Sequence, residues 1–142
     1  MSISIVNKLL SALPVFSNLD YDELRILAFI GKRHEHKSNQ PIYEAYSQSE
    51  GTILLSAGRA ILHYKDSHRP DVVARRGMLM NELALFMPKQ FDYDISGLEM
   101  ITTYHFGRED FIRLIEEFPE IGKKIQYNIA QRLATSLSAV GN

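Results

Sequence analysis

The sequence contains no cysteine. Without a thiol, the chain can form neither a disulfide framework nor a thiolate zinc site. It also lacks an uninterrupted apolar stretch of the roughly 20 residues needed to span a bilayer. Residues 1–6 show no basic leader followed by an apolar run. We therefore expect a cytoplasmic protein without membrane contact.

An excess of either charge sign is also missing. The 16 Lys and Arg residues and the 17 Asp and Glu residues are scattered along the chain and give a net charge of −1. A nucleic-acid-binding protein would usually carry a basic stripe that neutralises phosphates. The densest basic segment, residues 32–37, is short and interrupted by Glu35, so we interpret it as a solvated strand. We expect no nucleic acid among the partners.

Helical patterns occupy both ends of the chain, whose 142 residues suit one domain. Apolar residues at three-to-four spacing predict a first helix that stops at Pro14. A second helix is predicted to start at Asp20, with Glu23 in a capping-box position. Near the other end, Arg108 opens a helix, and Pro119 fits the first turn of another.

Short apolar runs separated by turn residues fill the middle of the chain and predict an antiparallel sandwich or barrel. The expected strands are residues 51–56, 59–65, 72–75, 95–98 and 100–106. Residues 81–87 interrupt this pattern with a short helix that Asn81 would cap through its side chain. We predict a single domain over 1–142. Its parts are helices in 1–30, a β region in 31–106 and helices in 108–138.

Three stretches, in order and at matching spacing, resemble the cyclic-nucleotide-binding domain of catabolite-activator-type regulators, kinase regulatory subunits and gated channels. They are LLSALPVFSNL at 9–19, GMLMNELALF at 77–86, and residues 111–137, which include EFPEI. The middle stretch is similar to the family's phosphate-binding cassette, with its usual core Gly-Glu-Leu-Ala-Leu. The resemblance implies a mainly β fold, an antiparallel β-roll or jelly roll (double-stranded β-helix), with N-terminal helices and two C-terminal helices.

The resemblance also implies a ligand pocket. In the family, a short helix N-terminus and an arginine hold the cyclic phosphate, and a glutamate, here Glu82, holds the ribose hydroxyl. Counting back from residues 97–99, the arginine position falls on Phe91, or on Asp92 after a one-residue slip. Neither is cationic, and losing a charge-assisted contact costs about 1.5–3 kcal/mol. The pocket candidates are Met80, Asn81, Glu82, Leu83, Ala84, Lys89, Phe91 and Asp92.

We therefore expect a regulatory module in signal transduction, without catalysis, that does not bind cyclic AMP or GMP in the usual way and needs no cofactor. It would act through dimerisation, a protein partner or another small molecule. The alternative is a functional cyclic-nucleotide sensor with a non-standard phosphate contact, for which Lys89, Arg75 and Arg76 are the nearest cations. No helix-turn-helix pattern follows the last predicted helix, so we expect no DNA-binding domain.

The last predicted helix carries an apolar stripe, and in regulators of this type that helix pairs with its twin across a two-fold axis. The stripe predicts a homodimer contact through Ile125, Ile129, Leu133 and Leu137.

The sequence predicts neither a metal site nor an enzyme active site. His34 and His36 alternate along a predicted strand, with Glu44 nearby, as in metal-binding cupins. Two histidines without a third placed ligand do not make a site, so we predict no metal. The sequence contains neither a Gly-x-Ser-x-Gly elbow nor a His-Glu-x-x-His helix, and we predict no catalytic residue.

Overall fold

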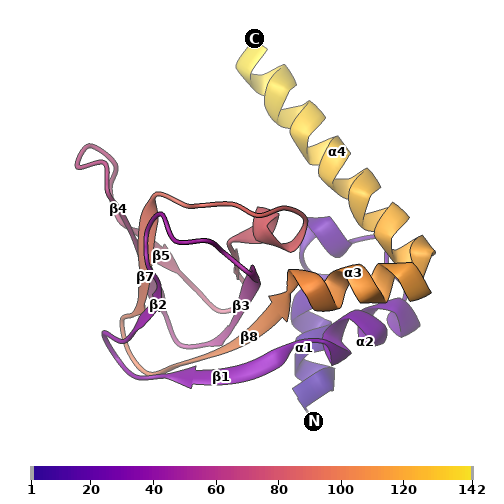
Figure 1. The fold of residues 1–142 in the computed structure, drawn as a ribbon, viewed down its shortest axis with the longest axis horizontal. Helices are drawn as coiled ribbons and strands as arrows, with labels where there is room; N and C mark the ends of the chain where they lie inside the picture. Colours follow the sequence, from indigo (N-terminus) through magenta and orange to yellow (C-terminus); the bar gives the residue numbers. More distant parts are fainter. Residues whose placement is uncertain (1, 142) are drawn as a thin grey trace. The chain divides into compact units, whose positions relative to one another are not determined.

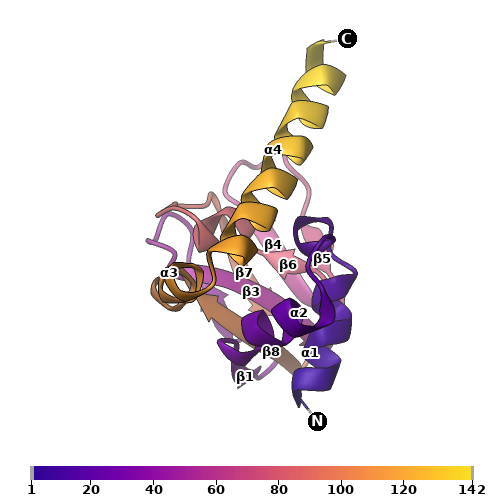
Figure 2. The ribbon, with the colours of Figure 1, turned by 90° about the vertical axis from the view of Figure 1, so that its right-hand side faces the viewer.

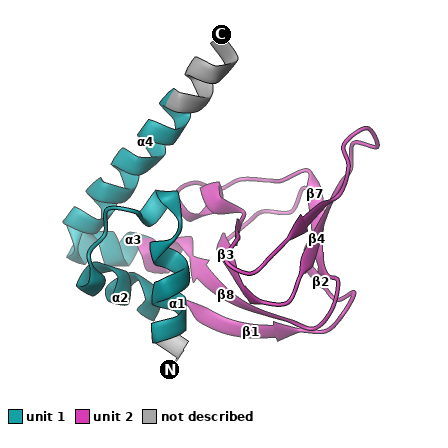
Figure 3. Ribbon diagram, turned by 180° about the vertical axis from the view of Figure 1, so that it is seen from behind, with its two compact units in different colours: residues 1–29, 112–142 teal, residues 30–111 magenta. Residues whose placement is uncertain are grey.

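The computed structural model describes residues 2–141, with side chains described for 4–134. The chain divides into two compact units, one formed by residues 1–29 with 112–142 and the other by residues 30–111 (Figure 3). The expectation, drawn from the sequence, that residues 1–142 form a single domain stays a prediction.

Residues 30–111, all of which the structure describes, form two four-stranded antiparallel sheets (Figure 1). In spatial order, the first sheet consists of β1 (Lys32–His36), β8 (Ile101–Gly107), β3 (Gly51–Ala57) and β6 (Leu79–Met80). The second consists of β2 (Pro41–Tyr43), β7 (Tyr93–Gly97), β4 (Ala60–Tyr64) and β5 (Val72–Ala74). This arrangement confirms the predicted β-roll.

The register of the first sheet decides which side chains face inward. Ile53 of β3 lies opposite His105 of β8, and Leu55 lies opposite Thr103. Because side chains alternate along a strand, these four residues share one face of the sheet. Ile53 and Leu55 belong to the buried apolar core that both sheets build. His105 and Thr103 therefore also point into the roll.

The junction of β3 and β8 requires glycine. Gly51 lies opposite Gly107 at the end of the pairing between the two strands. A Cβ atom at Gly51 would overlap the carbonyl oxygen of Phe106 and crowd the Cα atom of Gly107. The two backbones can approach this closely only because Gly51 carries no side chain.

Two strands were missed by the sequence analysis. β2 has three residues and begins with proline, and β6 has two residues. Neither is long enough to show the period-two alternation that identifies a strand. The strands predicted at 51–56, 59–65, 72–75, 95–98 and 100–106 correspond to β3, β4, β5, β7 and β8.

The other unit is helical. It contains α1 (Ser2–Ser11), the 3₁₀-helix η1 (Pro14–Phe16), α2 (Tyr21–Phe29) and α4 (Pro119–Gly141), and α1 packs against α2 (Figure 2). The helix α3 (Arg108–Glu117) crosses the division between the units in sequence. The predicted capping box is confirmed, since the N–H of Asp20 donates to Glu23 Oε1 (3.0 Å) and the N–H of Glu23 donates to Asp20 Oδ1 (2.8 Å). Within the part of the chain described here, no helix is long and apolar enough to cross a bilayer.

Polar contacts hold α4 against the N-terminal segment of the same unit. The buried Asn128 side chain donates from Nδ2 to the Val15 carbonyl (2.9 Å) and to Asn18 Oδ1 (2.6 Å). Lys124 Nζ lies 2.6 Å from Glu23 Oε1, and this hydrogen bond raises the pKa of Lys124. Asn128 thus satisfies a carbonyl that belongs to a fully buried residue.

Replacement of Asn128 tests this connection. Asn128→Ala leaves the Val15 carbonyl without its donor, and we expect the free energy of unfolding to fall by about 1–3 kcal/mol. Chemical denaturation followed by circular dichroism measures the change. Gln126→Ala, at an exposed position on the same helix, is the matched control and should change stability by less than about 0.5 kcal/mol. Equal losses in the two variants would contradict the role of Asn128.

Candidate functional site: a polar cavity in the β-roll

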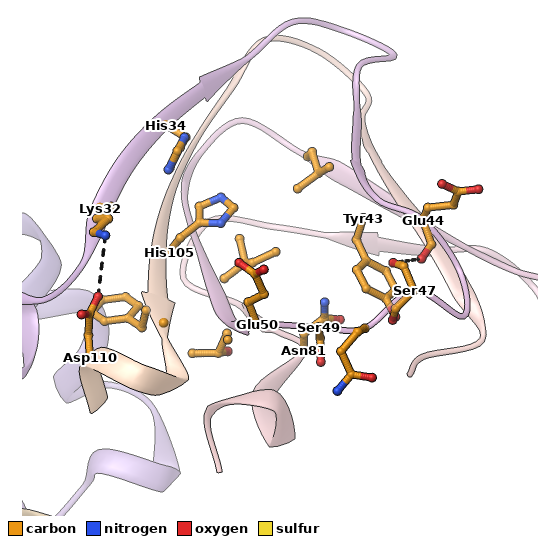
Figure 4. A pocket seen from close by; sticks show the side chains of 17 residues that line it. Lys32, His34, Tyr43, Glu44, Ser47, Ser49, Glu50, Asn81, His105 and Asp110 are labelled. Carbon is orange, nitrogen blue, oxygen red and sulfur yellow. Dashed lines mark hydrogen bonds and ion pairs between the residues drawn. The ribbon is translucent and has the colours of Figure 1, made fainter. Parts of the chain in front are cut away.

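A cavity of about 460 Å³ opens within residues 30–111 (Figure 4). Its walls come from β1, β2, the segment between β2 and β3, β3 and the end of β8, together with Asn81. His34 and His105 line one side of it, and Glu50 rises from the segment between β2 and β3 (Figure 4). Apolar lining comes from Ile42, Tyr43, Ile53 and Phe106. The cavity therefore combines a carbon-lined wall with several polar groups, as ligand sites commonly do.

The segment after β6 forms the cassette predicted from sequence, although its geometry differs. The expected helix over 81–87 is a 3₁₀-helix, η2 (Glu82–Leu85), and the prediction that the Asn81 side chain caps it is wrong. Asn81 has φ 57° and ψ 43°, a left-handed conformation that asparagine tolerates better than most residues. Its Oδ1 atom instead accepts a hydrogen bond from the Tyr93 hydroxyl (2.6 Å). Burial of Tyr93 raises the pKa of this phenol, so it remains a donor.

Arg108 fastens the cassette at its other end. Its Nη1 atom donates to the carbonyls of Ala84 (2.8 Å), Ser49 (3.1 Å) and Met87 (3.3 Å). One guanidinium therefore ties η2 and the residues after it to the segment between β2 and β3. No local sequence pattern predicts this contact, because Arg108 shows only the pattern of the first residue of a helix.

The position expected for the phosphate-binding arginine is apolar and packed. Phe91 lies against Tyr43 (ring centroids 5.8 Å apart) and Tyr93 (5.4 Å). Lys89 Nζ lies 5.6 Å from the centroid of the Phe91 ring. The neighbouring Asp92 faces Arg69, with Oδ2 and Nη1 3.8 Å apart.

The predicted pocket residues are only partly brought to the cavity. Asn81 lines it, whereas the remaining candidates are not among its lining residues, namely Met80, Glu82, Leu83, Ala84, Lys89, Phe91 and Asp92. Arg75 and Arg76 are exposed and do not line it either. A ligand role for the remaining candidates stays a prediction.

Histidines gather where β1 meets β8. The ring centroids of His34 and His105 lie 4.4 Å apart, and those of His36 and His105 lie 5.9 Å apart. The Thr103 hydroxyl oxygen lies 3.1 Å from His36 Nε2 and 3.0 Å from His105 Nε2. Burial, followed by the field of His34 and His36, lowers the pKa of His105 to about 4. Burial also lowers the pKa of His36, so both imidazoles favour the neutral form.

The charged residues of the cavity are mostly acidic. Glu44, Glu50 and Asp110 line it, and Lys32 is the one lysine or arginine among its described lining residues. Lys32 Nζ lies 3.7 Å from Asp110 Oδ2, so its charge is largely offset. From their sequence pattern, His34 and Glu44 were candidates only for metal ligation. Among the described residues, no group of three or more histidine or carboxylate side chains is placed to hold a metal ion.

Solved structures share this architecture. No protein-family model matches the sequence, and no curated protein matches it. The N-terminal domain of a transcriptional regulator from Streptomyces coelicolor A3(2) is 18% identical, with a TM-score of 0.86 over 93% of this chain and 94% of that chain. A cyclic nucleotide-binding-like protein from Brucella abortus is 18% identical, with a TM-score of 0.69 over 78% of this chain and 97% of that chain.

The Thermus thermophilus catabolite activator protein is also 18% identical, with a TM-score of 0.72 over 91% of this chain and 62% of that chain. The fold is that of a cyclic-nucleotide-binding domain. Structures that share it include domains of transcriptional regulators. The resemblance drawn from the three sequence stretches is confirmed at the level of the fold.

In this cyclic-nucleotide-binding fold, the predicted dimer stripe on α4 is unevenly exposed. Ile125 is fully buried and presents no surface to a second chain. Ile129 is half-buried, and Leu133 is 55% exposed. The Leu137 side chain lies outside the described residues. The homodimer contact stays a prediction, and among the described positions it would depend on Ile129 and Leu133.

Removal of the Arg108 guanidinium should loosen the cassette. We expect Arg108→Gln to lower the free energy of unfolding by about 1–3 kcal/mol, because three carbonyls lose a charged donor. Amide hydrogen exchange should speed up at residues 82–87 and 49–50. Arg25→Gln, at an exposed position on α2, is the control and should leave exchange in both segments unchanged. Unchanged exchange in Arg108→Gln would refute the fastening role.

Acid should destabilise the fold through His105. The unfolded chain protonates this imidazole near pH 6.5, whereas in the folded protein its pKa is about 4. Above pH 6.5 the imidazole is neutral in both states and does not destabilise the fold. As the pH drops from about 6.5 to about 4, the unfolded chain takes up the proton first, so the free energy of unfolding falls. Between pH 7 and pH 4.5, His105→Gln should lose about 2 kcal/mol less than the unsubstituted protein in urea titrations. His68→Gln, an exposed control, should show the unsubstituted pH dependence.

Proposed function

We propose that this chain is a non-catalytic regulatory module of the cyclic-nucleotide-binding fold that does not hold cyclic AMP or GMP by the usual phosphate contact. The observation that carries the proposal is the environment of Phe91, where the arginine of the resembling family is expected. Phe91 packs against Tyr43 and Tyr93 and presents no charge. A guanidinium contact with phosphate is bidentate and charge-assisted, and a phenyl ring cannot replace it.

The surroundings support the same proposal. Asp92 occupies the arginine position if the alignment slips by one residue. It forms an ion pair with Arg69, and its carboxylate would repel a phosphate. Glu44 and Glu50 line the cavity, and the Arg108 guanidinium is used by backbone carbonyls. An anion entering this cavity would meet carboxylates and would have no described guanidinium turned toward it.

The module would act by other means, in the cytoplasm and as one domain over residues 1–142. Its partner would be a second copy of the chain, another protein, or a different small molecule in the cavity. The second copy would bind through Ile129 and Leu133 of α4. The occurrence of this fold in domains of transcriptional regulators supports a signalling role. Neither nucleic acid nor membrane is among the proposed partners.

Direct titration decides the ligand part of this proposal. Calorimetry of the full chain with cyclic AMP and with cyclic GMP should show no binding at concentrations up to about 100 μM, since the contact that supplies one to two decades of affinity is missing. Micromolar binding of either nucleotide would refute the proposal and favour the sensor with a non-standard phosphate contact. In that case, loss of binding in Lys89→Gln would identify the substitute cation.

A further inference from the structure

We propose that the cavity binds a small organic cation, an ammonium or amidinium compound, in place of a phosphate ester. This inference rests on the proposed function, because it names the ligand class for a module that has lost its anion contact. It depends on three observations about the cavity: two carboxylates without ion-pair partners, a buried amide with an unused donor, and an apolar wall.

The first observation concerns charge. Glu44 and Glu50 both line the cavity, and neither forms an ion pair with another described residue. The charge of Glu44 contributes to the raised pKa of Lys65, but the Lys65 ammonium pairs with Asp94, with 2.9 Å between Nζ and Oδ2. Lys32, the one lysine or arginine among the described lining residues, already faces Asp110, with 3.7 Å between Nζ and Oδ2. The lining of the cavity therefore carries more carboxylates than cations, which favours a cation and disfavours an anion.

The histidines do not reverse this balance. His105 lines the cavity, and its low pKa keeps it neutral at pH 7. The Glu50 carboxylate is turned toward the His105 side of the cavity in Figure 4. A cation bound beside Glu50 would thus meet the neutral ring of His105.

The second observation is independent of charge. Asn81 is only 4% exposed and lines the cavity. Its Oδ1 atom accepts from the Tyr93 hydroxyl, while its Nδ2 atom donates to no described residue. Buried amide donors are nearly always paired, so this N–H group is available for an acceptor atom of a ligand. The left-handed backbone at Asn81 holds the amide at this place.

The third observation sets the rest of the ligand. Ile53, Phe106 and the Tyr43 ring form an apolar part of the lining. A volume of about 460 Å³ accommodates a molecule of one or two rings. The ligand therefore carries a positively charged nitrogen for Glu50, a carbon skeleton for this wall, and an acceptor for Asn81.

Matched probes of opposite charge test the inference. The full chain, labelled with ¹⁵N, is titrated by NMR with benzamidine and phenethylamine, and in parallel with benzoate and 3-phenylpropionate. We expect the two cations to bind with dissociation constants of about 5 mM or tighter, because small probes retain only part of a ligand's affinity. The expected shifts lie at the Asn81 side-chain amide and the amides of Glu50 and Gly51. The two anions should bind at least ten-fold more weakly.

Variants separate local charge from net charge. The double variant Glu44→Gln/Glu50→Gln should weaken binding of both cations at least ten-fold. Glu116→Gln/Glu117→Gln, which removes the same charge from exposed positions outside the cavity, should bind them unchanged. Asn81 is left intact in both variants because its turn positions the cassette.

The outcomes distinguish failure of this inference from failure of the proposed function. This inference would be overturned if the cations did not bind at up to about 20 mM, a concentration a few-fold above the dissociation constant expected of such probes. Equal binding of cations and anions, or shifts outside the cavity, would overturn it as well. If cyclic AMP and GMP also fail to bind, the proposed function stands while the inference falls. Micromolar binding of either nucleotide overturns both conclusions.

Discussion

The hydrogen bond from the Tyr93 hydroxyl to Asn81 Oδ1 is the contact on which the candidate site depends. It links β7 of the second sheet to the turn after β6 of the first sheet, at the place where the cassette begins. The Asn81 backbone is left-handed and its oxygen is turned to Tyr93, so the side chain does not cap η2, and its nitrogen is left at the cavity. One buried pair therefore fixes both the shape of the cassette and the donor that it presents.

The groups around this contact disfavour a bound phosphate. The positions that would attract a phosphate hold Phe91, which is packed among tyrosines, and Asp92, which faces Arg69. The Arg108 guanidinium, which contacts the cassette, is used by backbone carbonyls. The carboxylates of Glu44 and Glu50 remain at the cavity without ion-pair partners among the described residues. A ligand with the opposite sign to cyclic AMP is the one that these groups suit.

Much of the fold was accessible from sequence, because its signals are local. Pro14, Asp20 and Pro119 act through backbone geometry and capping within a few residues, and the helices they delimit are confirmed. The longer strands show alternation or apolar runs that a short window detects. The two missed strands, β2 and β6, are defined by pairing with β7 and β3, so their short sequences contain too little pattern.

The candidate site was less accessible, because it depends on register. His105 and Glu50 carry no local signal. His105 meets His34 because β1 pairs with β8, and Glu50 reaches the same cavity because β3 pairs with β8. The side-chain orientation of Asn81 was predicted wrongly for a related reason. Its competing partner, Tyr93, lies twelve residues away on another strand, which no capping rule considers.

The glycine at the start of β3 also restricts how this site can vary. Gly51 and Gly107 both line the cavity, and no side chain fits at Gly51 without moving the backbone of β8. Natural variation therefore cannot shrink the cavity by enlarging Gly51. Changes in ligand preference would have to arise at exposed lining positions outside the strands, such as Glu44, Gln48 and Glu50.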